Sequence, residues 1–247
     1  MKTVNLLTTL LLLFFLFPGY SQTSTLPEGF VSLFNGNDLT GWIIPEGDNG
    51  HWKVIDGVID YDASSEAAGD KNLWSEKEYG DFTLLIDWRI KETPFTNPGV
   101  PLILPDGNVK LDENGKPVVM ALRDSDSGIY LRGNSKSQVN IWCWPIGSGE
   151  VYGYRTDPDM PAEIKRGVTP STNADKNIGE WNTFKITMKG EYLTVELNGI
   201  VVIDNAQLPG IPEKGRIALQ HHGHKENGKW AGPPSLVQFR NAFINEQ

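Results

Sequence analysis

The sequence contains few of the residues on which disulfides, thiol chemistry and metal clusters depend. Among its 247 residues are one cysteine, Cys143, and four histidines. A single cysteine excludes an intramolecular disulfide, so packing has to supply the stability of the fold. Cys143 lies in the apolar run Trp-Cys-Trp, which favours a buried thiol. The alternative, a nucleophile, has no histidine beside it in the sequence.

Glycine-rich phosphate loops, the dinucleotide-binding glycine fingerprint and paired CxxC motifs are absent, which argues against a nucleotide cofactor. Positive charge is also scarce: the sequence has 22 Lys and Arg residues but 31 Asp and Glu residues, which gives a net charge of -9. Such a chain is a poor match for nucleic acid or an anionic membrane surface, and a neutral partner fits better. Its eight tryptophans and seven tyrosines suit sugar rings, although most of them are expected to fill a core.

Long apolar runs are limited to one, from Leu6 to Phe17, which a lysine precedes and the small residues Gly19 and Ser21 follow. This order is typical of a cleavable export signal, and we predict that residues 1–21 are a signal peptide. The run is short for a bilayer span, so we expect an exported, soluble product without a stable membrane anchor. A retained signal that acts as an anchor is the alternative.

Short alternating runs separated by Gly, Asn, Asp and Pro recur along the rest of the chain, and no long segment has a helical period. Residues 82–90 show the pattern most clearly, because every second side chain is a large apolar one. Asp56-Gly57 and Asn198-Gly199 separate apolar runs and tolerate positive φ, so both predict tight hairpins. We therefore predict one all-β domain, residues 27–246, built as a β-sandwich of two antiparallel sheets.

Two stretches interrupt the strand pattern. Thr93 to Asp124 is rich in Pro, Gly and Asp and carries two turn signals, which predicts an inserted loop or a small hairpin. Pro158 to Asn177 is predicted to be a second long loop. Long loops on a rigid sandwich commonly carry the binding surface, so both stretches are candidates for shaping a site.

The polar faces of the predicted strands supply the candidate site. If the apolar side chains of each strand point into the core, their neighbours point to the opposite face. The residues placed there by this rule are Asp87, Arg89, Tyr130, Arg132, Gln138, Asn140, Trp142, Gln220 and His222. Were these strands neighbours in one sheet, the set would line a polar, aromatic-edged groove of the kind that binds sugars. Alternatively, each of these residues could belong to a solvent-exposed sheet face and form an ordinary cross-strand pair there, without any role in binding.

Three of the four histidines fall within the run His-His-Gly-His, at residues 221–224. Adjacent residues of a regular strand face opposite sides, so His221 and His222 are not expected to bind one metal together. An imidazole at a strand end needs little tuning to act as a general base, and we favour His222 for that role.

Ordinary glycoside hydrolysis uses a pair of carboxylates, but the sequence does not fix the distance in space between any two of them. Asp87, Glu150, Glu76 and the pair Asp124 and Asp126 are available, but most acidic residues serve solvation or turns. The run Asp-Ser-Asp-Ser-Gly that begins at Asp124 is predicted to be a turn, with a calcium-binding loop as the alternative.

The order of the motifs carries more information than any one of them. From about Gly29 to Ile244 the chain shows, in succession, GFVSLFNGNDLTGW, WKVIDGVI, NLWSEKEYGDFTLLIDWRI, DSGIYLRG, GEWNTFKITMKGEYLTVELNGIVV, IALQHHG and LVQFRNAFI. These blocks resemble, in the same order, those of the 3-keto-disaccharide hydrolase family. The resemblance implies a concanavalin A-like jelly roll, bacterial export to the periplasm or the cell exterior, and a substrate glycoside oxidised at the sugar C3 position.

The resemblance also implies where functional residues stand. Residues that match the family's blocks are Asp87, at a position often occupied by Glu, and Ser127, Gly128, Arg132, Gln220, His222, Gly223, Arg240 and Asn241. The chain departs from the family where many members carry a YEVQI-like run. Gln138 stands there in place of Glu and Asn140 in place of Gln, which removes a carboxylate from that position.

The chemistry implied by the resemblance is driven by a base. A ketone at C3 acidifies the C2 proton, so its removal leads to elimination of the aglycone from C1, after which water adds. His222 or Asp87 is the implied base, and Arg132 or a divalent metal is the implied stabiliser of the enolate. No other cofactor is expected. We assign sugar binding, as a hypothesis, to Arg89, Gln138, Asn140, Trp142 and Gln220.

Three other functions remain open at this level. A non-catalytic carbohydrate-binding module or lectin could use the same fold. A conventional glycoside hydrolase would need two carboxylates that flank the groove. A purely structural envelope protein would leave the polar strand faces unexplained.

Overall fold

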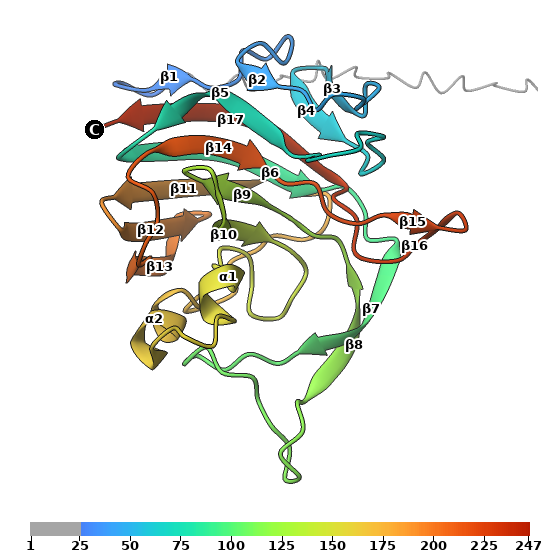
Figure 1. The fold of residues 1–247 in the computed structure, drawn as a ribbon, viewed down its shortest axis with the longest axis vertical. Coiled ribbons are helices and arrows are strands. Elements are labelled where there is room, and N and C mark those ends of the chain that lie inside the picture. Colours follow the sequence, from blue (N-terminus) through green and yellow to red (C-terminus); the bar gives the residue numbers. More distant parts are fainter. Residues whose placement is uncertain (1–25) are drawn as a thin grey trace, which may run out of the picture.

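The computed structural model describes residues 26–247. The predicted signal peptide, residues 1–21, and the alternative of a retained anchor therefore lie outside the described residues. Within the described part, no helix has both the length and the apolar character needed to cross a membrane. Strands dominate this part of the chain, and they pair antiparallel in two large sheets with two small hairpins beside them (Figure 1).

The larger sheet has eight strands. Its spatial order is β13 (Ile200–Gln207), β12 (Tyr192–Leu197), β11 (Asn182–Lys189), β6 (Phe82–Ile90), β17 (Val237–Glu246), β4 (Val58–Tyr61) and β3 (Trp52–Ile55), with β1 (Val31–Ser32) also paired to β17. The smaller sheet has five strands, in the order β10 (Asn134–Ile141), β9 (Ser127–Leu131), β14 (Gly215–Leu219), β5 (Leu73–Tyr79) and β2 (Trp42–Ile43).

The core lies between the two sheets. Every second side chain of β6, from Phe82 to Ile90, is at most 3% exposed, as the alternation predicts. The smaller sheet contributes four side chains with no exposed area: Ile129, Leu131, Val139 and Ile141. Because these four alternate with polar residues, the polar side chains of β9 and β10 are left on the outer face of the smaller sheet. The predicted all-β sandwich of antiparallel sheets is confirmed.

Both predicted hairpins are present. Asp56 has a φ of 50° in the turn between β3 and β4, and Asn198 has a φ of 54° between β12 and β13. The glycine that follows each of them also has positive φ. This pair of left-handed residues gives the turn the twist that matches the flanking strands.

The two predicted loops take different forms. Residues 93–124, which we call the arm, contain the paired strands β7 (Phe95–Pro101) and β8 (Val119–Asp124), in line with the small hairpin predicted there. Residues 158–177 include the short helix α2 (Ala162–Gly167), which follows α1 (Tyr152–Arg155). The sequence pattern did not predict these helices because each is shorter than two turns. A further hairpin joins β15 (Lys225–Glu226) to β16 (Lys229–Trp230).

Candidate functional site

A cavity of about 440 Å³ lies on the outer face of the smaller sheet, between the arm and α1. Its volume falls within the range of roughly 300–1,000 Å³ that is common for small-molecule sites. Five of the eight predicted site residues line it: Gln138, Asn140, Trp142, Gln220 and His222. The other lining residues are Asn97, Asp126, Ser135, Trp144, Tyr152, Gly153 and Pro233.

A chain of amides holds the floor of the cavity in place. Gln138 Nε2 donates to Gln220 Oε1 at 2.6 Å and to the backbone oxygen of Ser127 at 3.1 Å. Gln220 Nε2 in turn donates to the Tyr130 hydroxyl at 3.1 Å. Gln138 lies within reach of these side chains because it is directly opposite Tyr130 in the pairing of β9 and β10. All three side chains are at most 9% exposed, so the floor offers fixed hydrogen-bonding groups.

Asn140 has unused hydrogen-bonding capacity. It is 3% exposed, and its Nδ2 has no partner among the described residues. A buried donor without an acceptor costs about 1–3 kcal/mol. An oxygen acceptor from a ligand or a water molecule at Nδ2 would remove that cost.

His222 is held in one tautomer. Its Nδ1 lies 2.7 Å from the backbone oxygen of Pro233, which can only accept, so neutral His222 carries its proton on Nδ1 and a lone pair on Nε2. The His222 backbone N–H donates to Ser235 Oγ, and Ser235 Oγ donates to the backbone oxygen of Asp126 at 2.8 Å. This bridge fixes the segments that carry His222 and Asp126 next to each other.

Asp126 is the carboxylate of the cavity. Burial raises its pKa to about 7, although the charge of His222 opposes the shift, and Asp124 adds to it. A carboxyl group with a pKa near neutrality can give or take a proton at the pH of most cells. The sequence showed Asp126 as one of several available acids, but its position 96 residues from His222 gave no sign that the two would meet.

An aromatic wall, formed by Trp142, Trp144 and Tyr152, closes one side of the cavity. The two indoles stack with ring centroids 4.2 Å apart and planes 3° apart, and Tyr152 stands edge-on to both. Trp144 Nε1 donates to Asp124 Oδ2 at 3.1 Å, which fixes the outer indole. Rigid aromatic faces of this kind suit the apolar faces of sugar rings. Tyr152 was missed in the sequence because it lies on the unpredicted helix α1.

Asp87 and Arg89 lie away from the cavity, so the expectation that they share one polar face with His222 is wrong. Both belong to β6, which is in the larger sheet. Asp87 accepts hydrogen bonds from Thr183 Oγ1 at 2.6 Å, Asn241 Nδ2 at 2.8 Å and Arg240 Nε at 3.2 Å. Arg89 Nε donates to a glutamine of the neighbouring β17 at 2.6 Å. These contacts cross-link the strands of the larger sheet.

Arg132 also lies outside the cavity. It follows the last residue of β9 and has a φ of 51°, so the strict alternation of the strand ends before it. Its guanidinium group donates to the backbone oxygens of Gly80, Gly190 and Pro212 and pairs with Asp81 at 2.8 Å. With 2% of its surface exposed, Arg132 ties four chain segments together instead of facing a substrate.

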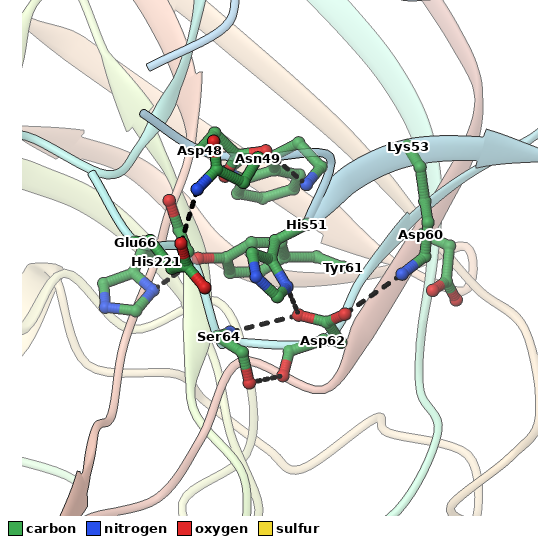
Figure 2. A network of polar contacts seen from close by, with 12 residues as sticks. Asp48, Asn49, His51, Lys53, Asp60, Tyr61, Asp62, Ser64, Glu66 and His221 are labelled. Atoms are coloured by element: carbon green, nitrogen blue, oxygen red, sulfur yellow. Dashed lines mark hydrogen bonds and ion pairs between the residues drawn. The ribbon is translucent and has the colours of Figure 1, made fainter. Parts of the chain in front are cut away.

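His221 and His222 have separate surroundings, as predicted. His221 Nδ1 lies 2.6 Å from the hydroxyl of Tyr61 on β4, and Figure 2 shows this pair beside the polar contacts of His51 and Asp62. Burial lowers the pKa of His221 to about 4, so it is neutral near pH 7. Among residues 26–247, no three His, Cys, Asp or Glu side chains gather in a way that could hold a metal ion.

Cys143 lines a second cavity of about 350 Å³ that shares Trp142 and Trp144 with the first. Burial raises the pKa of its thiol to about 12. The thiolate is the reactive form of cysteine, so this environment favours the inert, structural interpretation.

Solved structures with this fold include two candidate glycosyl hydrolases from Parabacteroides distasonis ATCC 8503. One is 21% identical in sequence, and the alignment covers 90% of this chain and 85% of the other, with a TM-score of 0.59. The second is 18% identical, with 89% and 94% of the two chains covered and a TM-score of 0.54. At these identities the likeness shows the fold alone. Comparison with curated proteins gives no significant match.

The fold and the cavity together define an antiparallel β-sandwich with a polar, aromatic-walled site of small-molecule size. More narrowly, the chain belongs to the family described as the 3-keto-alpha-glucoside-1,2-lyase-like domain, whose model matches residues 29–245. The resemblance in the order of the sequence blocks is thereby confirmed. Membership of this family supports a carbohydrate-acting enzyme that cleaves glycosides.

Proposed function

We propose that the cavity cleaves 3-keto-glycosides by elimination across C1 and C2, followed by addition of water. The observation that carries this proposal is the set of ionisable groups: Asp126 is the one carboxylate among the described lining residues, and His222 accompanies it. A conventional glycoside hydrolase needs two carboxylates on opposite sides of the scissile bond. One carboxylate and one imidazole suit proton abstraction next to a carbonyl instead.

In this reaction His222 Nε2 takes the proton from C2 of the oxidised sugar. The electron pair of that C–H bond forms an enolate with the C3 carbonyl. When the carbonyl re-forms, a double bond forms between C1 and C2, and the bond from C1 to the aglycone oxygen breaks. Protonated Asp126 gives its proton to the departing oxygen, which its raised pKa allows near neutral pH. Water then adds across the double bond, with its oxygen at C1 and a proton at C2.

The remaining lining residues bind the sugar in this proposal. Asn140 Nδ2, the donor without a partner, is assigned to the C3 oxygen, where negative charge develops. Gln138 and Gln220 bind hydroxyl groups, and the aromatic wall packs against an apolar ring face. These roles replace Asp87 and Arg132, whose side chains serve other contacts. The described residues offer no set of three metal ligands, so no step is derived through the divalent metal that the resemblance allows.

The direct test is incubation of the purified protein with a 3-keto-glucoside, with and without a chelator. Release of the aglycone and absorbance of the enone intermediate are followed. We expect turnover in the wild type and a loss of about 100-fold or more in His222→Ala, the usual scale for a general base. His224→Ala is the matched control, because that side chain is 64% exposed and does not line the cavity. Unchanged turnover in His222→Ala would remove His222 from the mechanism.

A carbohydrate-binding module is the second candidate, and the rigid aromatic wall is the observation that favours it. Titration with unoxidised oligosaccharides would distinguish the two functions. Tight binding of these sugars, with no aglycone released from the 3-keto form, would support the binding module.

Export to the periplasm or the cell exterior is also proposed, on the basis of the order of charged, apolar and small residues in residues 1–21. Cell fractionation followed by sequencing of the mature N-terminus tests it. A mature protein that keeps residues 1–21 would contradict cleavage.

A further inference from the structure

The second cavity, of about 350 Å³, lies where the ends of the two sheets meet. The larger sheet contributes Trp88 from the last turn of β6 and Asn182 from the start of β11. The lining residues Trp142 and Trp144 come shortly after the end of β10, in the smaller sheet. Of the described lining residues, the two cavities share only this pair of tryptophans. The second cavity is therefore a separate space from the one on the outer face.

Two buried polar atoms in the lining of the second cavity have unused hydrogen-bonding capacity. Trp88 is 1% exposed, and its Nε1, a donor, has no partner among residues 26–247. Asp175 Oδ1, an acceptor, has no partner within the same range. Buried polar groups in folded proteins nearly always have a hydrogen-bond partner, from the protein or from ordered water. The second cavity thus offers one donor and one acceptor to an occupant.

Hydrogen bonds on the other side of Asp175 hold its carboxylate in place. Asp175 Oδ2 accepts the backbone N–H of Ser148 at 2.8 Å, and the Asp175 backbone N–H donates to Asn173 Oδ1 at 2.9 Å. The next residue, Lys176, donates its backbone N–H to Asn182 Oδ1 at 2.9 Å, which ties the segment to the larger sheet. The free oxygen of Asp175 therefore has a fixed position before any ligand arrives.

The charges around the second cavity favour a neutral ligand. The carboxylate of Asp175 repels an anion, and the side chains of Arg123 and Lys176 repel a cation. Ile90 and Ile178 add apolar surface to the lining. A hydroxyl group is neutral and can both donate and accept a hydrogen bond. A hydroxylated ring with apolar C–H faces therefore matches both the polar and the apolar parts of the lining.

We propose that the second cavity is a further carbohydrate-binding site, which takes one neutral hexose unit. Trp88 Nε1 donates to one hydroxyl group of this sugar, and Asp175 Oδ1 accepts from another. The volume of the cavity lies within the range of roughly 300–1,000 Å³ that is common for small-molecule sites. Binding here does not depend on the elimination chemistry, so either proposal can fail while the other stands.

The test is an NMR titration of isotope-labelled wild-type protein with D-glucose, followed through the indole N–H signals. We expect the Trp88 signal to shift in a saturable way because its N–H gains an acceptor. The expected Kd is about millimolar, the usual range for a ligand of this size. Trp42 is the internal control, because its Nε1 is also buried without a partner in the described chain but lines neither cavity.

Asp175→Asn removes the acceptor with little change of shape. The amide oxygen can still accept the Ser148 N–H, but a donor then replaces Oδ1. We expect the Kd for glucose, measured at Trp88, to rise about tenfold or more. Asp62→Asn is the matched control, because it removes the same charge from a partly buried carboxylate that lines neither cavity. Its Kd should equal that of the wild type.

Charged sugars test the ligand class without any variant. Glucosamine and glucuronate have the same ring as glucose with a positive or a negative charge, and both should bind more weakly than glucose. Tighter binding of either would overturn the assignment of a neutral ligand.

The titration decides the proposal even if a variant does not fold. A Trp88 signal that does not move at glucose concentrations far above the expected Kd would overturn it, and would mean that the cavity holds only water. Equal shifts of the Trp88 and Trp42 signals would also overturn it, because they would show a non-specific effect of the sugar. So would equal Kd values for folded Asp175→Asn and Asp62→Asn.

Discussion

Gly128 has no Cβ, and this leaves the space that the Gln138 side chain occupies in the floor of the cavity. Gly128 is therefore the most informative position for mutation. Gly128 pairs with Asn140 across β9 and β10, and the Gln138 side chain lies over it. A Cβ at residue 128 would lie 2.7 Å from Gln138 Cγ and 2.8 Å from its Cδ. Carbon atoms prefer separations of roughly 3.5–4.0 Å. Gly128→Ala therefore has to push the Gln138 side chain out of its position.

The displaced amide loses its hydrogen bonds to Gln220 Oε1 and to the backbone oxygen of Ser127. Each bond contributes about 0.5–1.5 kcal/mol, and buried partners left unsatisfied add about 1–3 kcal/mol. We expect Gly128→Ala to lower the free energy of unfolding by about 2–4 kcal/mol. For a domain of this size the corresponding decrease in Tm is roughly 4–16 °C.

The assay is urea denaturation of a double-mutant cycle that adds Gln138→Ala. Once the Gln138 side chain is truncated, the new methyl group has nothing to displace. Gly128→Ala should then cost almost nothing in that background, giving a coupling energy of about 2 kcal/mol or more. Additive effects of the two substitutions would refute the argument, because they would mean that Gln138 does not occupy the space above Gly128.

Three further predictions concern protons and buried charge. In Asp126→Asn, kcat/KM for a 3-keto-glucoside should fall about 100-fold. The wild-type rate should decline above about pH 7, where Asp126 loses its proton, and this decline should vanish in the variant. A retained decline would exclude Asp126 as the acid. His221 has a pKa lowered from 6.5 to about 4, so below pH 6.5 the unfolded chain binds the extra proton and the free energy of unfolding falls as the pH decreases towards 4. His221→Gln should reduce this pH dependence in urea titrations at pH 7 and pH 5, and an unchanged slope would contradict it. Arg132→Met should lower the free energy of unfolding by about 3–5 kcal/mol, since three backbone oxygens lose their hydrogen-bond donor. The KM of the folded variant should equal that of the wild type. A changed KM would place Arg132 near the substrate.

The assignment of polar side chains to the faces of the strands was partly right for a local reason. Alternation along a strand is fixed by the backbone, so Gln138 and Asn140 could be assigned to the face opposite Val139 and Ile141 without knowing any neighbour. The same reasoning put Asp87 on a polar face, which is also correct. It could not say that this face belongs to the other sheet.

The sequence by itself determined the strands, the two tight hairpins and the family, because alternation, Asp-Gly and Asn-Gly turns and the order of the blocks are properties of adjacent residues. Tertiary structure alone decided which polar faces meet. Strand order is set by contacts between segments far apart in the chain, and it separated Asp87 from His222. It also brought Asp126 beside His222, where burial raises the pKa of the Asp126 carboxyl group to about 7. Such a shift comes from the loss of water around the group, which only the packed structure produces.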